Sequence, residues 1–205
     1  HVLGNASCDR TSGISTSLHY KNLSLSALFD IKVGADLYSM SARAAHESGK
    51  SPATLKGRDE WYHSEELRQE AGIPKGSSEW KPTGGFVAPG VIDNGDGTYR
   101  KNDIIINPED YWMSVCRNAP SMFIYDNSYV KCREIVLAYQ FPKKWLGKVL
   151  QDMSVSFVAR NPFIVWKNIP NIDPDSNYNN TTGMGLEYGS LPSRKSYGIN
   201  VNIKF

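Results

Sequence analysis

The feature that most constrains this chain is a strict two-residue alternation in its final segment. Tyr197, Ile199, Val201, Ile203 and Phe205 occupy one set of positions, and Gly, Asn and Lys residues occupy the positions between them. A period of two predicts a β-strand with one apolar face and one polar face. The alternation alone does not decide whether the apolar face meets a protein core or lipid.

The same alternation recurs in four earlier segments of the chain. A two-residue connection, Lys21–Asn22, joins the first two segments and indicates a hairpin. In the third segment Lys131 and Arg133 are in phase with the later apolar residues, so either the strand leaves the apolar layer there or a bulge shifts the phase. The five expected strands cover residues 13–20, 23–34, 128–141, 152–162 and 194–205.

The connections between these strands alternate between short and long. The two long loops cover residues 35–127 and 163–193, and the first of them contains two expected short helices and a "DNGDG" turn. Because successive antiparallel strands place their connections at opposite ends, both long loops fall on one side of the sheet. This layout is typical of outer-membrane barrels. A soluble β-sandwich also has alternating strands, so the pattern alone leaves both folds open.

Composition excludes several classes of protein. The 205 residues contain no run of about 18 apolar residues, so no transmembrane helix is expected. The 23 basic and 21 acidic residues form no basic stripe with interleaved aromatics, which argues against nucleic-acid binding. The three cysteines lack metal-ligand spacing. The opening "HVLGNASCDR" has neither an initiator methionine nor a leader, so we expect the chain to be a fragment of a longer protein.

The polar clusters do not predict catalysis, a metal or a cofactor. His46 and His63 lack an HExxH spacing and are expected on solvated loop helices. The "DNGDG" stretch lacks the carboxylate of a calcium loop, because Ile104 occupies the twelfth position. A polysaccharide-degrading enzyme needs an opposed carboxylate pair, whereas Glu65 and Glu66 are neighbours on one helix.

Three stretches carry a resemblance to a known family: "YDNSYVKCREIVLAYQFPKKWL", "MSVSFVARNPFIVWKNIPNIDPDSNYNN" and "GLEYGSLPSRKSYGINVNIKF". In this order they resemble the C-terminal end of SusC-like (SusC/RagA-type) TonB-linked outer-membrane transporters. Three positions depart from the family pattern: Cys132 replaces Leu, Pro162 replaces Leu, and Asp175 replaces Glu. We expect Pro162 to mark the point where strand pairing ends on one side.

The resemblance implies an all-β fold, a plugged transmembrane antiparallel barrel of about 22 strands. Residues 1–205 would supply the last five strands, and another segment of the same protein would supply the plug and the remaining barrel. The resemblance further implies an outer-membrane importer of glycans or peptides in a Gram-negative bacterium. By this resemblance the protein would not be an enzyme, and it would work with TonB, a SusD-like lipoprotein and the barrel-assembly machinery. The alternative is a soluble β-sandwich carbohydrate-binding module.

The candidate functional residues fall into three groups. Candidate substrate contacts in the two long loops, for which loop packing and Asx turns are the competing interpretations, are Trp61, Tyr62, Trp80, Tyr111, Trp112, Asp173 and Asp175. Residues expected to face the lipid bilayer are Val155, Phe157, Ile199, Val201 and Ile203. Aromatic residues expected at the water interfaces are Tyr139, Phe141, Trp145 and Tyr197. Phe205 resembles a barrel-assembly signal, and the competing interpretation is an ordinary last strand.

Overall fold

A computed structural model describes residues 2–147, 149–177 and 183–205 of the chain. The chain divides into two compact units. The sheet unit comprises His1–Ser39 and Ile124–Phe205, and the loop unit comprises Met40–Phe123. Residues 178–182, which belong to the second expected loop, lie outside the described residues.

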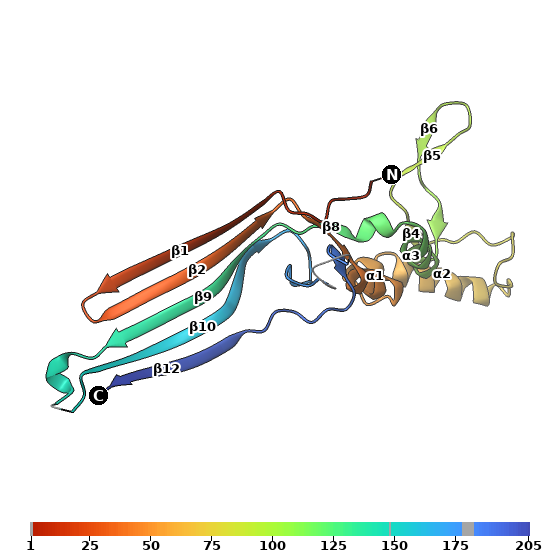
Figure 1. Ribbon diagram of the computed structural model, residues 1–205. Helices are drawn as coiled ribbons and strands as arrows, with labels where there is room; N and C mark the ends of the chain where they lie inside the picture. Colours follow the sequence, from red (N-terminus) through yellow and green to blue (C-terminus); the bar gives the residue numbers. More distant parts are fainter. Residues whose placement is uncertain (1, 148, 178–182) are drawn as a thin grey trace. The chain divides into compact units, whose positions relative to one another are not determined.

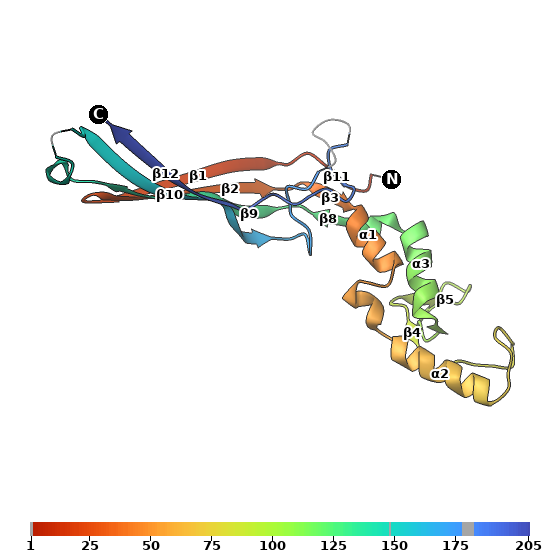
Figure 2. The same ribbon diagram turned by 90° about the horizontal axis from the view of Figure 1, so that it is seen from below.

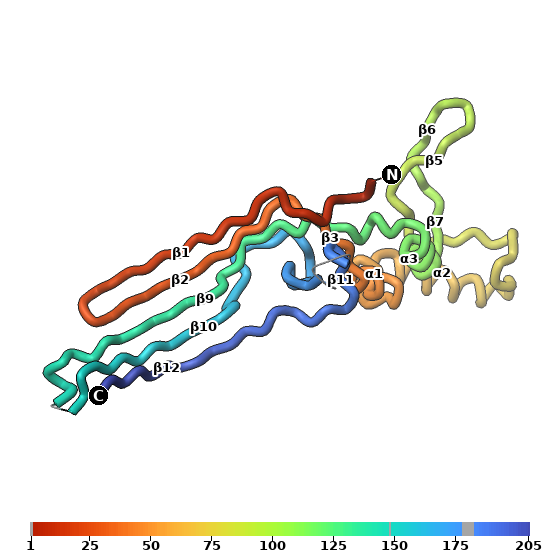
Figure 3. The backbone as a smooth tube through the Cα atoms, in the orientation of Figure 1, coloured from red at the N-terminus to blue at the C-terminus, as the bar shows by residue number. Residues whose placement is uncertain are grey.

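The sheet unit is built on five long antiparallel strands in the order β1-β2-β9-β10-β12, which lie side by side in Figure 1. Their bounds are Arg10–Tyr20 (β1), Leu23–Val33 (β2), Tyr129–Gln140 (β9), Asp152–Lys167 (β10) and Ser196–Lys204 (β12). Strands β1 and β12 form the two edges of the sheet (Figure 3). The expectation of a chain made mostly of β-strands with a few helices is confirmed.

Several strand bounds differ from the expected ones. Strand β1 begins at Arg10 rather than at residue 13, because Arg10 pairs with Val33 and extends the hairpin ladder. Strand β10 continues to Lys167 instead of ending at residue 162, so the second long loop begins later than expected. The last strand begins at Ser196 rather than residue 194 and ends at Lys204.

Pro162 is accommodated by an irregularity in β10. The ladder with β9 passes from Arg160 opposite Glu134 directly to Phe163 opposite Cys132, and Asn161 has a positive φ of 48°. Because the bulge removes Pro162 from the ladder, its missing N–H costs no strand hydrogen bond. Pairing with β12 ends at Arg160, two residues before the proline, as expected for one side of the strand.

A second irregularity explains the phase change in the third expected strand. Leu28 of β2 lies opposite Glu134 of β9, whereas the next residue, Phe29, lies opposite Cys132. One residue of β9, Arg133, is therefore extra relative to β2. Of the two explanations left open by the sequence, a bulge matches this register.

Three short strands complete the sheet unit. They are β3 (Asp36–Ser39), β8 (Ile124–Asp126) and β11 (Leu186–Glu187), and they form a small sheet in the order β11-β3-β8. Leu37 and Ile169 are buried in this unit. The small sheet attaches part of the segment between β10 and β12 to the rest of the unit through the parallel pair β11 and β3.

The loop unit is mainly helical (Figure 2). Its helices are α1 (Met40–Glu47), α2 (Arg58–Glu70) and α3 (Pro108–Asn118), with 3-10 turns at Pro52–Leu55 and Pro120–Phe123. Two small antiparallel pairs join β4 (Phe86–Val87) to β7 (Ile105–Ile106) and β5 (Val91–Asp93) to β6 (Tyr99–Lys101). No described helix is long and apolar enough to span a bilayer.

Helix α3 was not expected from the sequence, although its start signals are present. Asn107 precedes it, and its side-chain oxygen accepts a hydrogen bond from the backbone N–H of Glu109 at 3.0 Å. Pro108 occupies the first turn, which also contains Glu109 and Asp110. An Asn cap, an early proline and acidic residues in the first turn are the usual signals of a helix start.

Candidate functional site

The five-stranded sheet has one apolar face, which we define by its cross-strand rows. Val155 lies opposite Val201 and Phe157 lies opposite Ile199 in the β10–β12 ladder. Directly opposite residues point to the same side of a sheet, so each row continues across all five strands. The three rows are Leu18, Leu25, Leu137, Phe157 and Ile199; Tyr20, Leu23, Tyr139, Val155 and Val201; and Thr16, Ala27, Ile135, Ala159 and Tyr197.

The opposite side, the polar face, carries mostly small or polar side chains, with Val136 and Val158 as exceptions. Its rows are His19, Ser24, Ala138, Ser156 and Asn200; and Ser17, Ser26, Val136, Val158 and Gly198. The apolar face is open in this unit, since Leu18 is 65% and Ile199 is 71% exposed. An uncovered apolar surface of this extent marks a contact with a partner or with a membrane.

The expected interface aromatics lie toward the two ends of the apolar face, taken along the strands. Tyr139 and Phe141 pack edge to face with ring centroids 5.2 Å apart, and Phe141 lies 6.4 Å from Trp145 beyond the end of β9. Toward the other end of the apolar face, Tyr197 stacks on Phe157 with ring centroids 6.2 Å apart. Aromatic residues at both ends of an apolar band are typical of a sheet that crosses a bilayer.

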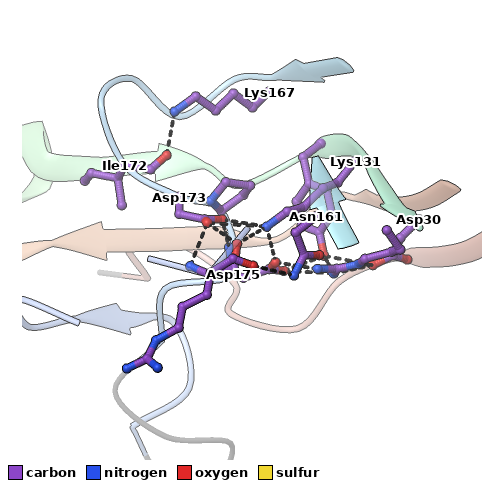
Figure 4. A network of polar contacts seen from close by, with 12 residues as sticks. Asp30, Lys131, Asn161, Lys167, Ile172, Asp173 and Asp175 are labelled. Carbon is purple, nitrogen blue, oxygen red and sulfur yellow. Dashed lines mark hydrogen bonds and ion pairs between the residues drawn. The ribbon is translucent and has the colours of Figure 1, made fainter. Parts of the chain in front are cut away.

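A cluster of five charged side chains lies near the start of β9, and we call it the ion-pair cluster (Figure 4). Lys131 Nζ lies 3.1 Å from Asp173 Oδ1 and 2.5 Å from Asp175 Oδ2. The guanidinium of Arg133 bridges Asp175 Oδ2 at 2.6 Å and Asp30 Oδ2, also at 2.6 Å. The Lys131 side chain is only 2% exposed. The cluster thus fastens the segment after β10 to β9 and β2.

Neutral groups complete the hydrogen bonding of this cluster. The Tyr129 hydroxyl donates to Asp175 Oδ1 at 3.1 Å. Ser193 donates its backbone N–H to Asp173 Oδ2 at 2.9 Å, and its hydroxyl oxygen accepts a hydrogen bond from Lys131 Nζ. A buried lysine is tolerated only when carboxylates and further hydrogen bonds replace its water, and Lys131 has both.

Positioning of the cluster follows from the bulge in β9. Asp30 lies opposite Lys131 on the side of the sheet away from Phe29 and Cys132, which is the polar face. Because Arg133 is the extra residue of β9, its side chain reaches the same carboxylate, Asp175, as the side chain of Lys131. The irregularity that interrupts the apolar pattern therefore brings two cations together.

The neighbours of Asp175 in the cluster lower the pKa of its carboxyl. Burial raises the pKa of its carboxyl, but hydrogen bonds and charge from Arg133 and Lys131 outweigh the burial and lower the pKa from 3.8 to about 2. The pKa of Asp173 is also lowered, since hydrogen bonds from Ser193 and Lys131 overcome its burial. Both carboxylates are therefore ionised at neutral pH.

Acid is expected to release the segment that carries Asp175. The pKa of Asp175 is lower in the folded protein than in the unfolded chain. The stabilisation provided by its ion pairs is therefore fully present above the unfolded pKa and is lost as the pH falls from about 4 to about 2. Hydrogen exchange of the backbone amides of residues 168–177 and 183–193, measured across this pH range, should show a progressive loss of protection as the pH falls. In Asp175→Asn the dependence should be weaker, and equal dependence in both proteins would contradict the assignment.

The loop unit contains a cavity of about 650 Å³, which we call the loop pocket. One face of helix α2, with residues three or four positions apart, lines one side of the pocket. The end of α1 and the start of α3 supply most of the remaining wall. The lining residues of α2 are Arg58, Trp61, Tyr62, Glu65 and Gln69. The other lining residues are His46, Glu47, Ser48, Gly49, Thr54, Lys75, Asn107, Pro108, Glu109 and Trp112.

Hydrogen bonds and ring packing hold one wall of the loop pocket in place. The ring of His46 packs 4.9 Å from that of Trp112, and its Nδ1 lies 2.7 Å from the Ala42 carbonyl oxygen. A carbonyl oxygen only accepts, so Nδ1 donates to it, and Nε2 lies 3.2 Å from the Ser51 hydroxyl oxygen. Arg58 Nη2 donates to the Thr54 hydroxyl at 3.0 Å.

The candidate substrate contacts do not lie in one place. Trp61, Tyr62 and Trp112 line the loop pocket. Tyr111 packs against Phe86 and Trp112 with centroids 4.6 Å and 5.1 Å away, and Trp80 does not line the pocket. Asp173 and Asp175 belong to the ion-pair cluster of the sheet unit, where their oxygens bind Lys131 and Arg133.

Sequence reasoning missed the cations of the cluster and the polar lining of the pocket. Lys131 and Arg133 could have been predicted as members of a cluster, because charged residues in phase with an apolar strand face require partners. Glu65 and Arg58 could not have been predicted as pocket residues, since charged residues on a loop helix are usually solvated. Among the described residues no three His, Cys, Asp or Glu side chains gather as metal ligands.

An exposed apolar face, a face of mostly small or polar residues and aromatic residues at both ends of the apolar band are features that the walls of transmembrane β-barrels share. No protein-family model matches the chain. TonB-dependent receptors P3 and P26 of Formosa agariphila are 22% and 21% identical over 210 residues, covering 100% of this chain. The chain spans 17% and 18% of the lengths of these relatives.

Solved structures of the RagAB importer share the fold. The "closed-closed" state of the RagAB peptide importer has a TM-score of 0.62 at 16% identity, covering 100% of this chain and 18% of that chain. The "open-open" state has a TM-score of 0.55 at 18% identity, covering 95% of this chain and 17% of that chain. The resemblance to SusC/RagA-type TonB-dependent receptors, stated from the motifs, is thus confirmed over the whole chain.

Proposed function

We propose that this chain is part of the wall and mouth of a TonB-dependent importer in the outer membrane of a Gram-negative bacterium. The observation that carries the proposal is the pair of unlike sheet faces. In this arrangement Val155, Phe157, Ile199, Val201 and Ile203 face lipid, and the polar face borders the aqueous lumen. Transport relies on binding and on force transmitted through TonB, so no catalytic residue is required.

The edges of the sheet support a closed barrel. Strands β1 and β12 are the outer strands of the five-stranded sheet, and each has one side without a neighbour in this sheet. In a bilayer an unpaired edge is not tolerated, because its backbone groups have no water to bind. Further strands of the same protein, about 22 in total, would pair with both edges, and its plug would fill the lumen.

The two loop regions between the strands would lie outside the cell, with a SusD-like lipoprotein as their partner. RagAB is a peptide importer, and the likeness to it supports nutrient import; glycans and peptides are the proposed cargo classes. Phe205 would serve as the signal read by the barrel-assembly machinery. The soluble sandwich module is less well supported, because the other sheets of the described residues have only three, two and two strands to cover the apolar face.

Cell fractionation and uptake test this function directly. The protein as the cell makes it should appear in the outer-membrane fraction and leave it only with detergent. Cells should take up labelled oligosaccharide or peptide through it, and removal of TonB should abolish that uptake. Deleting Phe205 should lower the amount assembled without changing uptake per assembled molecule. Recovery of the protein in the aqueous fraction would overturn the proposal.

A further inference from the structure

Three lysines at one end of the five-stranded sheet form an exposed basic patch. Lys21 lies in the turn between β1 and β2, and Lys143 and Lys144 lie in the 3-10 turn between β9 and β10. Both connections lie at the same end of the sheet, because the strands are antiparallel (Figure 1). All three residues are exposed, and none of their side chains makes a hydrogen bond or ion pair with a described residue. We call these three lysines the basic end.

Hydrogen bonds fasten the two connections to each other. The backbone N–H of Gln140 donates to the Asn22 carbonyl oxygen at 2.8 Å, and the Asn22 side-chain amide donates to the Gln140 carbonyl oxygen at 2.6 Å. The 3-10 turn is closed by the backbone N–H of Trp145, which donates to the Pro142 carbonyl oxygen at 2.9 Å. The three lysines are therefore carried by neighbouring segments of backbone that are held in place.

The basic end borders the apolar face. Lys21 Nζ lies 5.3 Å from the centroid of the Tyr20 ring, and Tyr20 lies in the same apolar row as Tyr139. Trp145 is 63% exposed, and its ring lies 6.4 Å from that of Phe141. Lysines beside aromatic residues at the border of an apolar surface extend their ammonium groups to the depth of the lipid headgroups.

No acidic side chain offsets the basic end beside the apolar face. This end of the sheet comprises residues 18–25, 138–147, 149–154 and 200–205. Among these residues, Asp152 has the only acidic side chain. Asp152 lies opposite Lys204, in phase with Ser156 of the polar face, and its carboxylate accepts a hydrogen bond from the Gln140 side chain. Asp152 and Lys204 therefore balance each other on the polar face, and the charge of the basic end remains.

We infer that the basic end binds the phosphate group of an anionic phospholipid. Lysine binds phosphate as a point charge, and each lysine near a negatively charged membrane surface adds to the attraction. The acyl chains of the same lipid lie along the apolar face. A free phosphate ion gains the charge contacts without the apolar ones, so the surface favours a lipid. The inference rests on the proposed function, in which the apolar face contacts the bilayer and the short connections are periplasmic.

Energy transfer from tryptophan to pyrene-labelled lipid tests the inference. The protein as the cell makes it, purified in detergent, is titrated with pyrene-labelled phosphatidylglycerol or phosphatidylcholine, and Trp145 supplies a donor beside the lysines. Phosphatidylglycerol should bind at least about tenfold more tightly than phosphatidylcholine at low salt. Raising the salt to about 1 M should remove most of this preference, because exposed charges are screened.

A double variant tests whether the basic end causes the preference. Lys143→Gln combined with Lys144→Gln should lower the preference for phosphatidylglycerol at least about fivefold, and adding Lys21→Gln should lower it further. The matched control is Arg194→Gln combined with Lys195→Gln, which also removes two exposed cationic side chains of the sheet unit, but just before β12 at the opposite end of the sheet. The control should keep the preference. Binding of phosphatidylcholine, which has no net charge, should be the same in all variants.

Three results would overturn the inference. The first is a native protein without a preference for phosphatidylglycerol, and the second is an equal loss of preference in the two double variants. The third is displacement of the lipid by inorganic phosphate at constant ionic strength, which would indicate a site for free anions. Failure of the proposed function is a separate result, because it is seen as protein outside the outer membrane, whichever lipid the purified protein prefers.

Discussion

Replacing Lys131 by methionine should destabilise the sheet unit by about 3 to 5 kcal/mol. The ammonium of Lys131, whose side chain is 2% exposed, pairs with Asp173 and Asp175. Without this ammonium, the two carboxylates remain partly buried. Of the two, only Asp175 keeps an ion pair, which it makes with Arg133. The free energy of unfolding in urea, measured for the protein reconstituted in phosphatidylcholine, gives the size of the effect.

Two further variants make this result specific to the cluster. Lys144→Met removes an exposed lysine from the 3-10 turn at Lys143–Trp145 and should change stability little. Adding Asp173→Asn to Lys131→Met should recover part of the loss, because one unpaired carboxylate is then removed. If Lys131→Met costs no more than Lys144→Met, the cluster does not hold the segment after β10.

Placing a lysine at Ile199 should impair membrane assembly strongly. Ile199 lies in the central apolar row, opposite Phe157. A lysine on the lipid face near the bilayer midplane costs about 2 to 4 kcal/mol, and Ile199→Lys should show a loss of that size in unfolding from lipid. The assembled amount in the outer-membrane fraction should fall accordingly.

The neighbouring position supplies the control for this experiment. Asn200 belongs to the polar face, in the row with Ser156 and Ala138, and Asn200→Lys places the same charge one residue away on the other side. It should assemble almost normally, because in the proposed arrangement its lysine would meet water in the lumen. A larger defect in Asn200→Lys than in Ile199→Lys would mean that the two faces are assigned the wrong way round.

Local patterns were a good guide where a structure depends on neighbours in the sequence. Alternation identified the two unlike faces, because side chains of a strand point to opposite sides regardless of its partners. The "DNGDG" turn and helix α2 were also local, since Gly, Asn and capping residues act within a few positions. Helix α3 was predictable on the same local grounds, because Asn107 and Pro108 are signals of a helix start.

Contacts between residues far apart in the sequence could not be predicted from local patterns. Lys131 and Asp173 are 42 residues apart, and no local rule pairs them. The extension of β10 past Pro162 likewise depended on the register with β9, where Arg160 and Phe163 pair and the proline does not. The walls of the loop pocket come from three helices whose packing no periodicity predicts.

The strand faces, the layout of short and long connections and the resemblance to SusC/RagA-type receptors were predictable from residue order alone. The pairing of Asp173 and Asp175 with cations of β9, and the cavity that three of the five candidate aromatics share, follow from the folded arrangement instead. The reason is that register, bulges and helix packing set which distant side chains meet. Those contacts are chosen by burial and charge pairing across the whole fold.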